Sequence, residues 1–494
     1  MTVVIAVDAG TTGVRSVAVG EDGRPRAFAY RALAQHFPRP GWVEHDPVEI
    51  AAAVSSTLGE VATSVAEAGD TVAGVGVTNQ RETAVAWDRR SGRPLHRAVV
   101  WSDRRTAQRC RDLRHEGLEP AVRATTGLVL DPYFSATKFE WLLGEGGLEA
   151  NGDLALGTVD SWVVWCLTGG AAHVTDPGNA SRTMLFDITA GAWSQELCER
   201  FGVPASALGE VRPSCGRVGM TEPSSAAGLR VPVAAMAGDQ QAALFGQACL
   251  APGMTKNTYG TGSFVLMNLG GGPPPEPPEG LLTTVAWSLG GALTYALEGA
   301  VFSTGSGVQW LRDGLGIITE AADCGPLAAG VDHTDGLYLV PAFSGLGSPW
   351  WDPGARAALI GLSRTTGRAQ MARAVVEAMA HQTVDVLRAM EGAGGMAVTE
   401  LRVDGGASVM DVLCQFQADL ARVPVRRPAV TETTALGAAY LAGLAEGVWS
   451  SVDEVAAHWQ ADAEYTPVMS ERSAGARHAA WLRAVERARS WPDG

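Results

Sequence analysis

The sequence of 494 residues lacks a surplus of basic charge. Its 38 lysines and arginines stand against 53 aspartates and glutamates, which gives a formal net charge of −15 at pH 7. Nucleic acids and anionic membranes bind through basic surfaces, so both are excluded as expected partners. An apolar run of membrane-spanning length is also missing, as are the basic stretch and cleavage site of a secretory signal. We therefore expect a cytoplasmic protein without membrane insertion.

Paired cysteines are missing as well. The seven cysteines are odd in number, scattered and never in a CxxC spacing, so we expect reduced thiols in the core. What the sequence does have is 46% hydrophobic residues, enough for the cores of two or three domains. Its 60 glycines follow no collagen period and stand at many apparent strand ends, which indicates an α/β fold.

The middle of the chain combines an apolar run with a polar strand end. Residues 231–237 (VPVAAMA) predict a buried strand, and residues 238–247 (GDQQAALFGQ) predict a turn into a helix. Asp239 and Gln240 then lie at the carboxyl end of a strand, where α/β proteins bind their ligands. Asp239 is a candidate catalytic base. Taken alone, the pattern fits equally well an aspartate that only caps the helix.

A polar turn also interrupts the first apolar run. Residues 3–7 and 16–19 predict two strands of a hairpin, and the tip between them is DAGTTGVR. Asp8 could hold Mg²⁺ through water and Arg15 could offset phosphate charge. An ordinary tight turn is the alternative. The groups offered to a phosphate are the backbone N–H groups and hydroxyls of Gly10, Thr11, Thr12 and Gly13.

Further polar clusters follow other predicted strands. Arg81 and Glu82 come after the buried run 72–77, where a pocket is a better explanation than a surface ion pair. Trp101 follows a similar strand and Tyr133 lies in a loop. The alternative for both is a plain core position, where most aromatic side chains lie.

The second half of the chain repeats the first hairpin. Residues 253–269 predict a strand, a Gly-Thr-Gly tip and a second strand, which indicates two related halves that clasp one phosphate chain. Residues 401–408 predict another strand, with Ser408 as the cap of the next helix. Residues 370–391 predict a helix in which His381 is an ordinary helix residue. Residues 433–447 predict a helix of small residues suited to close packing.

Three strand-end motifs, DAGTT, GTGSF and VDGGAS, surround GDQQ in the order typical of actin-like, ribonuclease-H-like ATPases. Longer stretches resemble the FGGY family of carbohydrate kinases, and within it the members that phosphorylate glycerol. The resemblance implies two α/β actin-like domains with a cleft between them, residues 1–247 for glycerol and the first phosphate turn and residues 248–494 for the nucleotide. The stretches are PGWVEHDP (40–47), TNQRETAVAW (78–87), TGLVLDPYFSATK (126–138), NASRTMLF (179–186), GDQQAALFGQ, KNTYGTG (256–262) and ALEGAVF (296–302).

The resemblance also implies an activity and a set of site residues. The reaction is the ATP-dependent phosphorylation of glycerol to sn-glycerol 3-phosphate, with Asp239 as general base and Asp8 and Asp239 near Mg²⁺. A homo-oligomer, a dimer or a tetramer, is expected. The residues matching glycerol contacts are Arg81, Glu82, Trp101, Tyr133, Asp239, Gln240 and Phe264, and those matching nucleotide contacts are Thr11, Thr12, Gly13, Arg15, Thr261, Gly305, Gln309 and Gly406.

This chain departs from the family pattern at several positions. Ala9 and Gly13 stand where the family usually has Gln and Ser, which removes polar groups from the phosphate turn. Met410 and Asp411 stand near the place where many members have an Asn on the adenine side, so no adenine contact is assigned. The absence of a Walker sequence is no objection, because phosphoryl transfer needs positioning and a metal more than one motif.

Two rival functions remain open at this stage. One is a kinase of the same family that acts on another polyol or on a ketose. The other is an actin-like or chaperone-type ATPase that works by binding, although the polar cluster at residues 78–82 would then lack a purpose.

Overall fold

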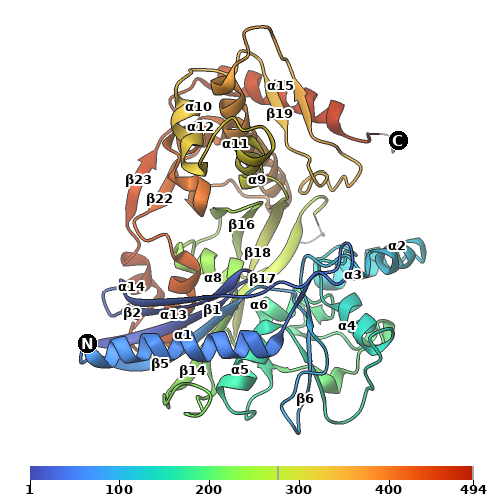
Figure 1. Ribbon diagram of the computed structural model, residues 1–494, viewed down its shortest axis with the longest axis vertical. Coiled ribbons are helices and arrows are strands. Elements are labelled where there is room, and N and C mark those ends of the chain that lie inside the picture. Colours follow the sequence, from blue (N-terminus) through green and yellow to red (C-terminus); the bar gives the residue numbers. More distant parts are fainter. Residues whose placement is uncertain (275–277, 492–494) are drawn as a thin grey trace.

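The structure, a computed structural model, describes residues 1–274 and 278–491. Two large mixed β-sheets organise these residues (Figure 1), the first built from the amino-terminal half of the chain. The predicted hairpin at residues 3–19 is confirmed as its strands β1 and β2. In spatial order the strands are β13 (Cys215–Met220), β14 (Pro232–Gly238), β5 (Thr71–Asn79), β1 (Thr2–Ala9), β2 (Gly13–Gly20) and β3 (Pro25–Ala32).

Strand β1 is buried on both faces, because successive side chains of a strand point to opposite sides. Ile5 and its alternate neighbours pack with helices α1 (Pro47–Glu67) and α5 (Val159–Leu167). Val4 and Ala6 pack on the other side with α8 (Asp239–Gly246) and α13 (Thr433–Ala445). A strand between two helical layers reads as a continuous apolar run, as the sequence does here.

The second sheet repeats the topology of the first. The order β3-β2-β1-β5-β14 corresponds to β18-β16-β15-β21-β22, with a hairpin followed by parallel strands in each case. The repeat predicted from the two hairpins is therefore present in the fold. In spatial order the strands are β17 (Leu282–Leu289), β18 (Ala292–Val301), β16 (Ser263–Gly270), β15 (Met254–Tyr259), β21 (Glu400–Asp404), β22 (Val425–Pro428) and β23 (Ala461–Tyr465).

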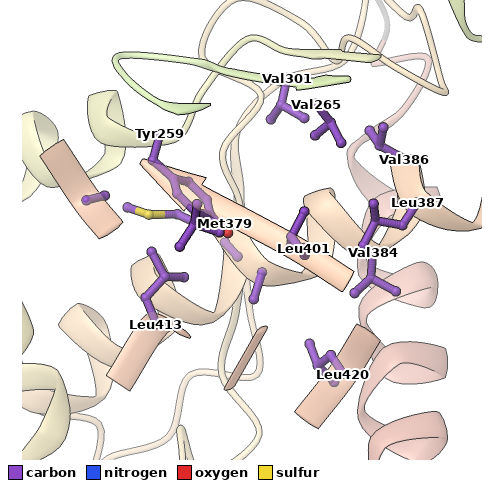
Figure 2. Packing of buried hydrophobic residues seen from close by; sticks show 14 of the residues in the cluster. Tyr259, Val265, Val301, Met379, Val384, Val386, Leu387, Leu401, Leu413 and Leu420 are labelled. Atoms are coloured by element: carbon purple, nitrogen blue, oxygen red, sulfur yellow. The ribbon is translucent and has the colours of Figure 1, made fainter. Parts of the chain in front are cut away.

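The core of the second half forms around β21. Figure 2 shows Leu401 of this strand among side chains of helices α11 (Arg368–Gly394) and α12 (Asp411–Ala421). Met379 of α11 and Leu413 of α12 belong to this cluster, and these two residues and Leu401 are at most 1% exposed. The predicted helix at residues 370–391 is thus confirmed.

The predicted cap of α12 is wrong. Ser408 lies in a short 3₁₀ turn, and its hydroxyl donates to the Gly405 carbonyl oxygen at 2.7 Å. Helix α12 begins after Met410, whose side chain makes no capping hydrogen bond. Serine competes for nearby backbone groups in turns as readily as at helix starts, so the residue type alone did not fix its role.

Helices α8 and α13 cross at very close range, as the small residues of the latter predicted. A Cβ added to Gly437 would lie 1.8 Å from the Ala242 carbonyl oxygen, and one added to Gly246 would lie 1.9 Å from that of Thr433. In Figure 1, α13 lies beside the blue strands of the first sheet although its residues are close to the carboxyl end. The last part of the chain therefore helps to fix α8.

A buried polar cluster attaches helix α15 (Glu471–Ala488) to α11. His381 stacks on Trp481 with ring centroids 5.2 Å apart, and its Nδ1 lies 3.3 Å from Nδ1 of His478. Trp481 donates to Asp385, which also pairs with His478. His381 is 1% exposed, so it is a core residue of this contact.

The other α-helices and the short strands lie mostly around the first sheet. All seven cysteines, each within the described ranges, are free thiols. No helix among the described residues has the length and apolar character to cross a membrane. These elements are α2 (Ala107–His115), α3 (Glu119–Thr126), α4 (Ala136–Leu143), α6 (Pro177–Ala180), α7 (Gln195–Arg200), α9 (Gly305–Gln309), α10 (Cys324–Ala329), α14 (Val452–Ala457), β4 (Glu44–His45), β6 (Val85–Asp88), β7 (Ala98–Val99), β8 (Leu154–Gly157), β9 (Val174–Thr175), β10 (Phe186–Asp187), β11 (Ala192–Trp193), β12 (Glu210–Val211), β19 (Tyr338–Val340) and β20 (Ala358–Ile360).

The close crossing predicts that Gly437→Ala destabilises the protein. The added methyl group collides with the backbone of α8, and overpacking of this kind costs about 1–3 kcal/mol. Urea unfolding measures the loss. The matched control is Gly475→Ala in α15, where the methyl group meets open space and a helical alanine is favoured by up to ~1 kcal/mol. Equal stability of the two variants would contradict the packing argument.

The His381 cluster predicts a dependence of stability on pH. Burial lowers the pKa of His381 well below its usual 6.5, and the charges of His478, Arg477 and Arg388 lower it further. Because the folded state resists protonation, this contribution to stability is present above pH 6.5 and is lost as the pH falls. His381→Phe keeps the stacked ring and cannot titrate, so its free energy of unfolding should fall less steeply below that pH. Parallel pH profiles for the two proteins would refute this assignment.

Candidate active site

Three parallel strands of the first sheet end at one edge. In the register of β1, β5 and β14, Ala9 is opposite Asn79, and Asn79 is opposite Gly238. The residues that follow each strand therefore emerge together, and they are the polar turn at residue 10, the cluster at 80–82, and Asp239. Sequence position at a strand end is what brings these distant segments into one place.

The residues predicted to bind glycerol gather around Arg81, and we name them the glycerol cluster. Its Nε lies 3.2 Å from a carboxylate oxygen of Asp239, and its Nη2 donates to the Tyr133 hydroxyl at 3.3 Å. The guanidinium carbon lies 5.7 Å from the ring centroid of Phe264, which comes from the second sheet. Trp101 joins the group through an edge-to-face contact with Tyr133 at 5.6 Å. Side chains from both halves of the chain thus meet around Arg81.

Glu82 occupies this cluster with an unusual backbone. Its φ of 63° lies in the left-handed region, which a glutamate rarely adopts, and its side chain is 2% exposed. The Ser135 hydroxyl donates to the Glu82 carbonyl oxygen at 3.0 Å, and the Lys138 ammonium lies 3.3 Å from the same oxygen. Strained backbone held by such contacts is typical of functional sites.

Asp239 is the first residue of α8, and the N-cap residue is Gly238. One carboxylate oxygen accepts from the Gln240 N–H at 2.7 Å, so the carboxylate does satisfy one donor of the first turn. Its side chain is still 31% exposed, which leaves a face open to a ligand. Burial raises the pKa of Asp239, and Arg81 and Lys256 oppose that rise. The carboxylate can therefore serve the helix and accept a proton.

Gln240 is held by a buried lysine that the sequence analysis did not select. The Lys256 ammonium donates to the Gln240 side-chain oxygen and, at 2.9 Å, to Thr258. This leaves the amide NH₂ of Gln240 as the group that can donate to a ligand. Burial lowers the pKa of Lys256 to about 8, and the charge of Asp404 works against that shift.

Asp8 is a buried carboxylate close enough to Asp239 to feel its charge. Burial raises the pKa of Asp8 to about 7, the charge of Asp239 raises it too, and Arg15 opposes the rise. A cation between the two carboxylates would relieve this repulsion, and Mg²⁺ commonly binds to one or two carboxylates together with phosphate oxygens and water. Within residues 1–274 and 278–491, no group of three or more metal-binding side chains is placed to hold an ion. The carboxylate chemistry of Asp8 and Asp239 fits Mg²⁺ whose remaining ligands are phosphate and water.

A cavity of about 730 Å³ lies at the edge of the second sheet. Four of the residues predicted to bind the nucleotide line it. Met410 and Asp411, which differ from the family pattern, line it as well. Glycines are needed here, since a Cβ on Gly305 would lie 2.5 Å from the Gly260 carbonyl oxygen. The four residues are Thr261, Gly305, Gln309 and Gly406.

The first phosphate turn lies outside the lining of that cavity. The Thr11 hydroxyl accepts from the Trp101 indole N–H at 2.9 Å, and the Thr12 carbonyl accepts from Tyr30. A Cβ on Gly13 would collide with the Tyr30 ring, which explains a glycine there. Arg15 pairs with Glu432, just before α13. The turn is thus tied to the glycerol cluster through Trp101.

Four buried charged residues at this site escaped the sequence analysis. Arg182 and Glu298 contact the glycerol cluster, Lys256 holds Gln240, and Asp404 accepts from Gln247 and Thr433. A signal existed, because Glu298 and Lys256 interrupt apolar strands, where a charge is rare unless it is paired.

The chain matches known proteins along nearly its whole length. Residues 3–246 match the N-terminal domain and residues 255–446 the C-terminal domain of the FGGY family of carbohydrate kinases. A glycerol kinase from Aromatoleum aromaticum is 52% identical over 99% of each chain, and one from Burkholderia cenocepacia is 50% identical over 99% of this chain and 98% of that one.

Solved structures agree with the sequence matches. The structure of Plasmodium falciparum glycerol kinase with ADP superposes with a TM-score of 0.93 at 32% identity, over 99% of this chain and 98% of the other. A xylulose kinase from Lactobacillus acidophilus shares the fold with a TM-score of 0.88 at 20% identity, over 99% and 98% of the two chains. Both domains of the family are matched, and about half of the residues are identical to those of the two bacterial glycerol kinases, so the chain belongs to the FGGY family of carbohydrate kinases.

Proposed function

We propose that this protein transfers the γ-phosphoryl group of ATP to glycerol and forms sn-glycerol 3-phosphate. The observation that carries the proposal is the position of Asp239, 3.2 Å from Arg81 in a cluster of the residues predicted to hold glycerol. The relatives that are about half identical over the full chain are glycerol kinases, and this supports the same substrate.

Glycerol is held by hydrogen bonds and one apolar wall. Arg81 donates, the carboxylates of Glu82 and Asp239 accept, and the amide of Gln240 donates to the three hydroxyl groups. Trp101, Tyr133 and Phe264 cover the carbon backbone. A small triol has little apolar surface to bury, so specificity has to come from several polar groups placed around it.

Asp239 acts as the general base. Its carboxylate accepts the proton of the attacking hydroxyl while Arg81 keeps it oriented, and its raised pKa makes it a better proton acceptor. The transferring group passes through a loose transition state, so most of the rate acceleration comes from position and charge.

Asp8 and Asp239 would hold Mg²⁺, which neutralises phosphate charge when it is bound. Thr11, Thr12, Gly13 and Arg15 hold the phosphates from the first turn, and Thr261 does so from the second. Gly305, Gln309 and Gly406 contact the rest of the nucleotide. Backbone N–H groups in such turns allow a protein with a net charge of −15 to bind a polyanion locally.

The organisation of the chain is part of the proposal. Residues 1–247 form the glycerol-binding domain and residues 248–494 the nucleotide-binding domain, with α13 of the second packed on the sheet of the first. A homodimer or homotetramer in the cytoplasm completes the description.

The nearest rival is phosphorylation of a different polyol or a ketose, since xylulose kinases share this fold. We expect kcat/KM for glycerol to exceed that for xylulose or ribulose by a wide margin, because the hydrogen-bonding groups of the glycerol cluster lie close together and suit a short substrate. A coupled assay of ADP formation measures all three. Similar kcat/KM values for a pentulose would refute the choice of substrate, and ADP formation without any of them would favour an ATPase that works by binding.

Asp239→Asn tests the base directly. The amide keeps the shape and much of the hydrogen bonding but cannot accept the proton, so kcat should fall by at least ~10²–10⁴-fold while glycerol binding changes less. Steady-state kinetics and the unfolding midpoint are the measurements.

The matched control is Asp46→Asn at the N-cap of α1, where the carboxylate accepts from Val48 and does no chemistry. Asparagine caps a helix nearly as well as aspartate, so this variant should keep both kcat and stability. If Asp239→Asn behaves like Asp46→Asn, the residue serves only its helix and the base lies elsewhere.

A further inference from the structure

Two buried arginines and two buried glutamates form a closed ring beside the glycerol cluster. Arg182 donates to Glu82 and to Glu298 at 2.7 Å each, and Arg81 donates to the other oxygen of Glu298 at 2.5 Å. Arg81 and Glu82 close the ring at 3.8 Å. All four side chains are at most 2% exposed. Two of the four are predicted to touch glycerol, and the other two have no assigned role.

The ring joins the two halves of the chain. Three of its members come from the first half, and Glu298 comes from β18 of the second sheet. Ala296, two residues earlier and so on the same face of the strand, packs in one cluster with Val4 and Ala6 of β1. Glu298 therefore points from the second sheet toward the first, and Arg81 is fixed by a residue outside its own half.

Arg182 contacts two residues predicted to hold glycerol, Glu82 and Tyr133. Besides its two carboxylate partners, its guanidinium carbon lies 5.7 Å from the ring centroid of Tyr133 and 5.2 Å from that of Phe134. Burial alone would raise the pKa of Glu298, and the charges of Arg182 and Arg81 outweigh burial and hold it below its usual value. Two arginines thus hold Glu298 in its charged form, and each member of the ring is restrained by two others.

We propose that Arg182 and Glu298 are positioning residues for glycerol, and that they couple the shape of the glycerol pocket to the placement of the two halves. The inference rests on the proposed function. Arg182 orients the Glu82 carboxylate and supports the Tyr133 ring, while Glu298 fixes the angle of the Arg81 guanidinium. A planar guanidinium with a fork of donors can bridge two carboxylates, whereas a lysine ammonium is a point charge without that geometry.

Arg182→Lys is the main test, because it keeps the charge balance and removes the fork. The Kd and KM for glycerol should rise roughly 10- to 100-fold, since small misplacements of binding groups have effects of this size. The KM for ATP should stay within about twofold, because no member of the ring lines the nucleotide cavity. Glycerol binding is measured by isothermal titration and the two KM values by steady-state kinetics.

Glu298→Gln is the second variant and approaches the ring from the other half. It keeps the shape and one acceptor, and the same glycerol-selective loss is expected. The matched control is Asp385→Asn, which removes a carboxylate that is buried to a similar degree from the His478 and Trp481 contacts. This control should lower the unfolding midpoint without changing the KM for glycerol.

The outcomes separate the possible explanations. A selective loss of glycerol affinity in both ring variants, absent from Asp385→Asn, supports the inference. An unchanged KM for glycerol in either ring variant, or equal losses for glycerol and ATP, overturns it and leaves the ring with a purely structural role. If the unmodified protein fails to phosphorylate glycerol, the proposed function fails instead, and the two failures are told apart.

Discussion

Charge buried between the two sheets has to be paired, and this constraint determines how the halves of the chain meet. Removing one partner from a buried ion pair costs about 3–5 kcal/mol, since no water replaces the lost partner of the remaining charge. In the first half, Glu82 contacts both Arg81 and Arg182, and Asp239 contacts Arg81 alone. Glu298, from the second sheet, bridges the two guanidinium groups at 2.5 Å and 2.7 Å. A different relative placement of the halves would separate Glu298 from the two arginines and leave buried charge unpaired. The ion pairs therefore favour one placement of the halves at the proposed substrate site.

Close packing of helices α8 and α13 places Asp239 beside this charged ring. Helix α8 starts with Asp239 and crosses α13 so closely that Gly246 and Gly437 admit no methyl group. Small residues allow that approach, and the approach sets the height of α8 above the first sheet. The direction of the Asp239 carboxylate thus depends on residues almost 200 positions later in the sequence. Helix α13, from the second half, thus provides packing for α8 that an isolated amino-terminal domain would lack.

Local patterns predicted the features that local physics controls. Strands β1, β5 and β14 were visible as apolar runs, and the polar residues after them had to share an edge once the strands were parallel. The pairing across the chain was not visible, since nothing near Arg182 in the sequence indicates Glu298, 116 residues away. Ser408 was misassigned because turns and helix starts use the same hydrogen bonds. The sequence predicted the helix that contains His381 but not the residues of α15 that bury its side chain.

The same local and distant contacts explain how a segment of nine residues can join two binding regions. Asp239 begins this segment at the edge of the first sheet, and Gln247 ends it by donating to Asp404 at the end of β21, 2.7 Å away. Thr433, at the start of α13, donates to the same carboxylate oxygen at 2.6 Å. The segment is thus held at both ends, by the contact of Asp239 with Arg81 and by that of Gln247 with Asp404. Phosphoryl transfer depends on the alignment of the attacking oxygen with the nucleotide. The segment that carries the proposed base therefore also fixes the separation between Asp239 and the end of β21.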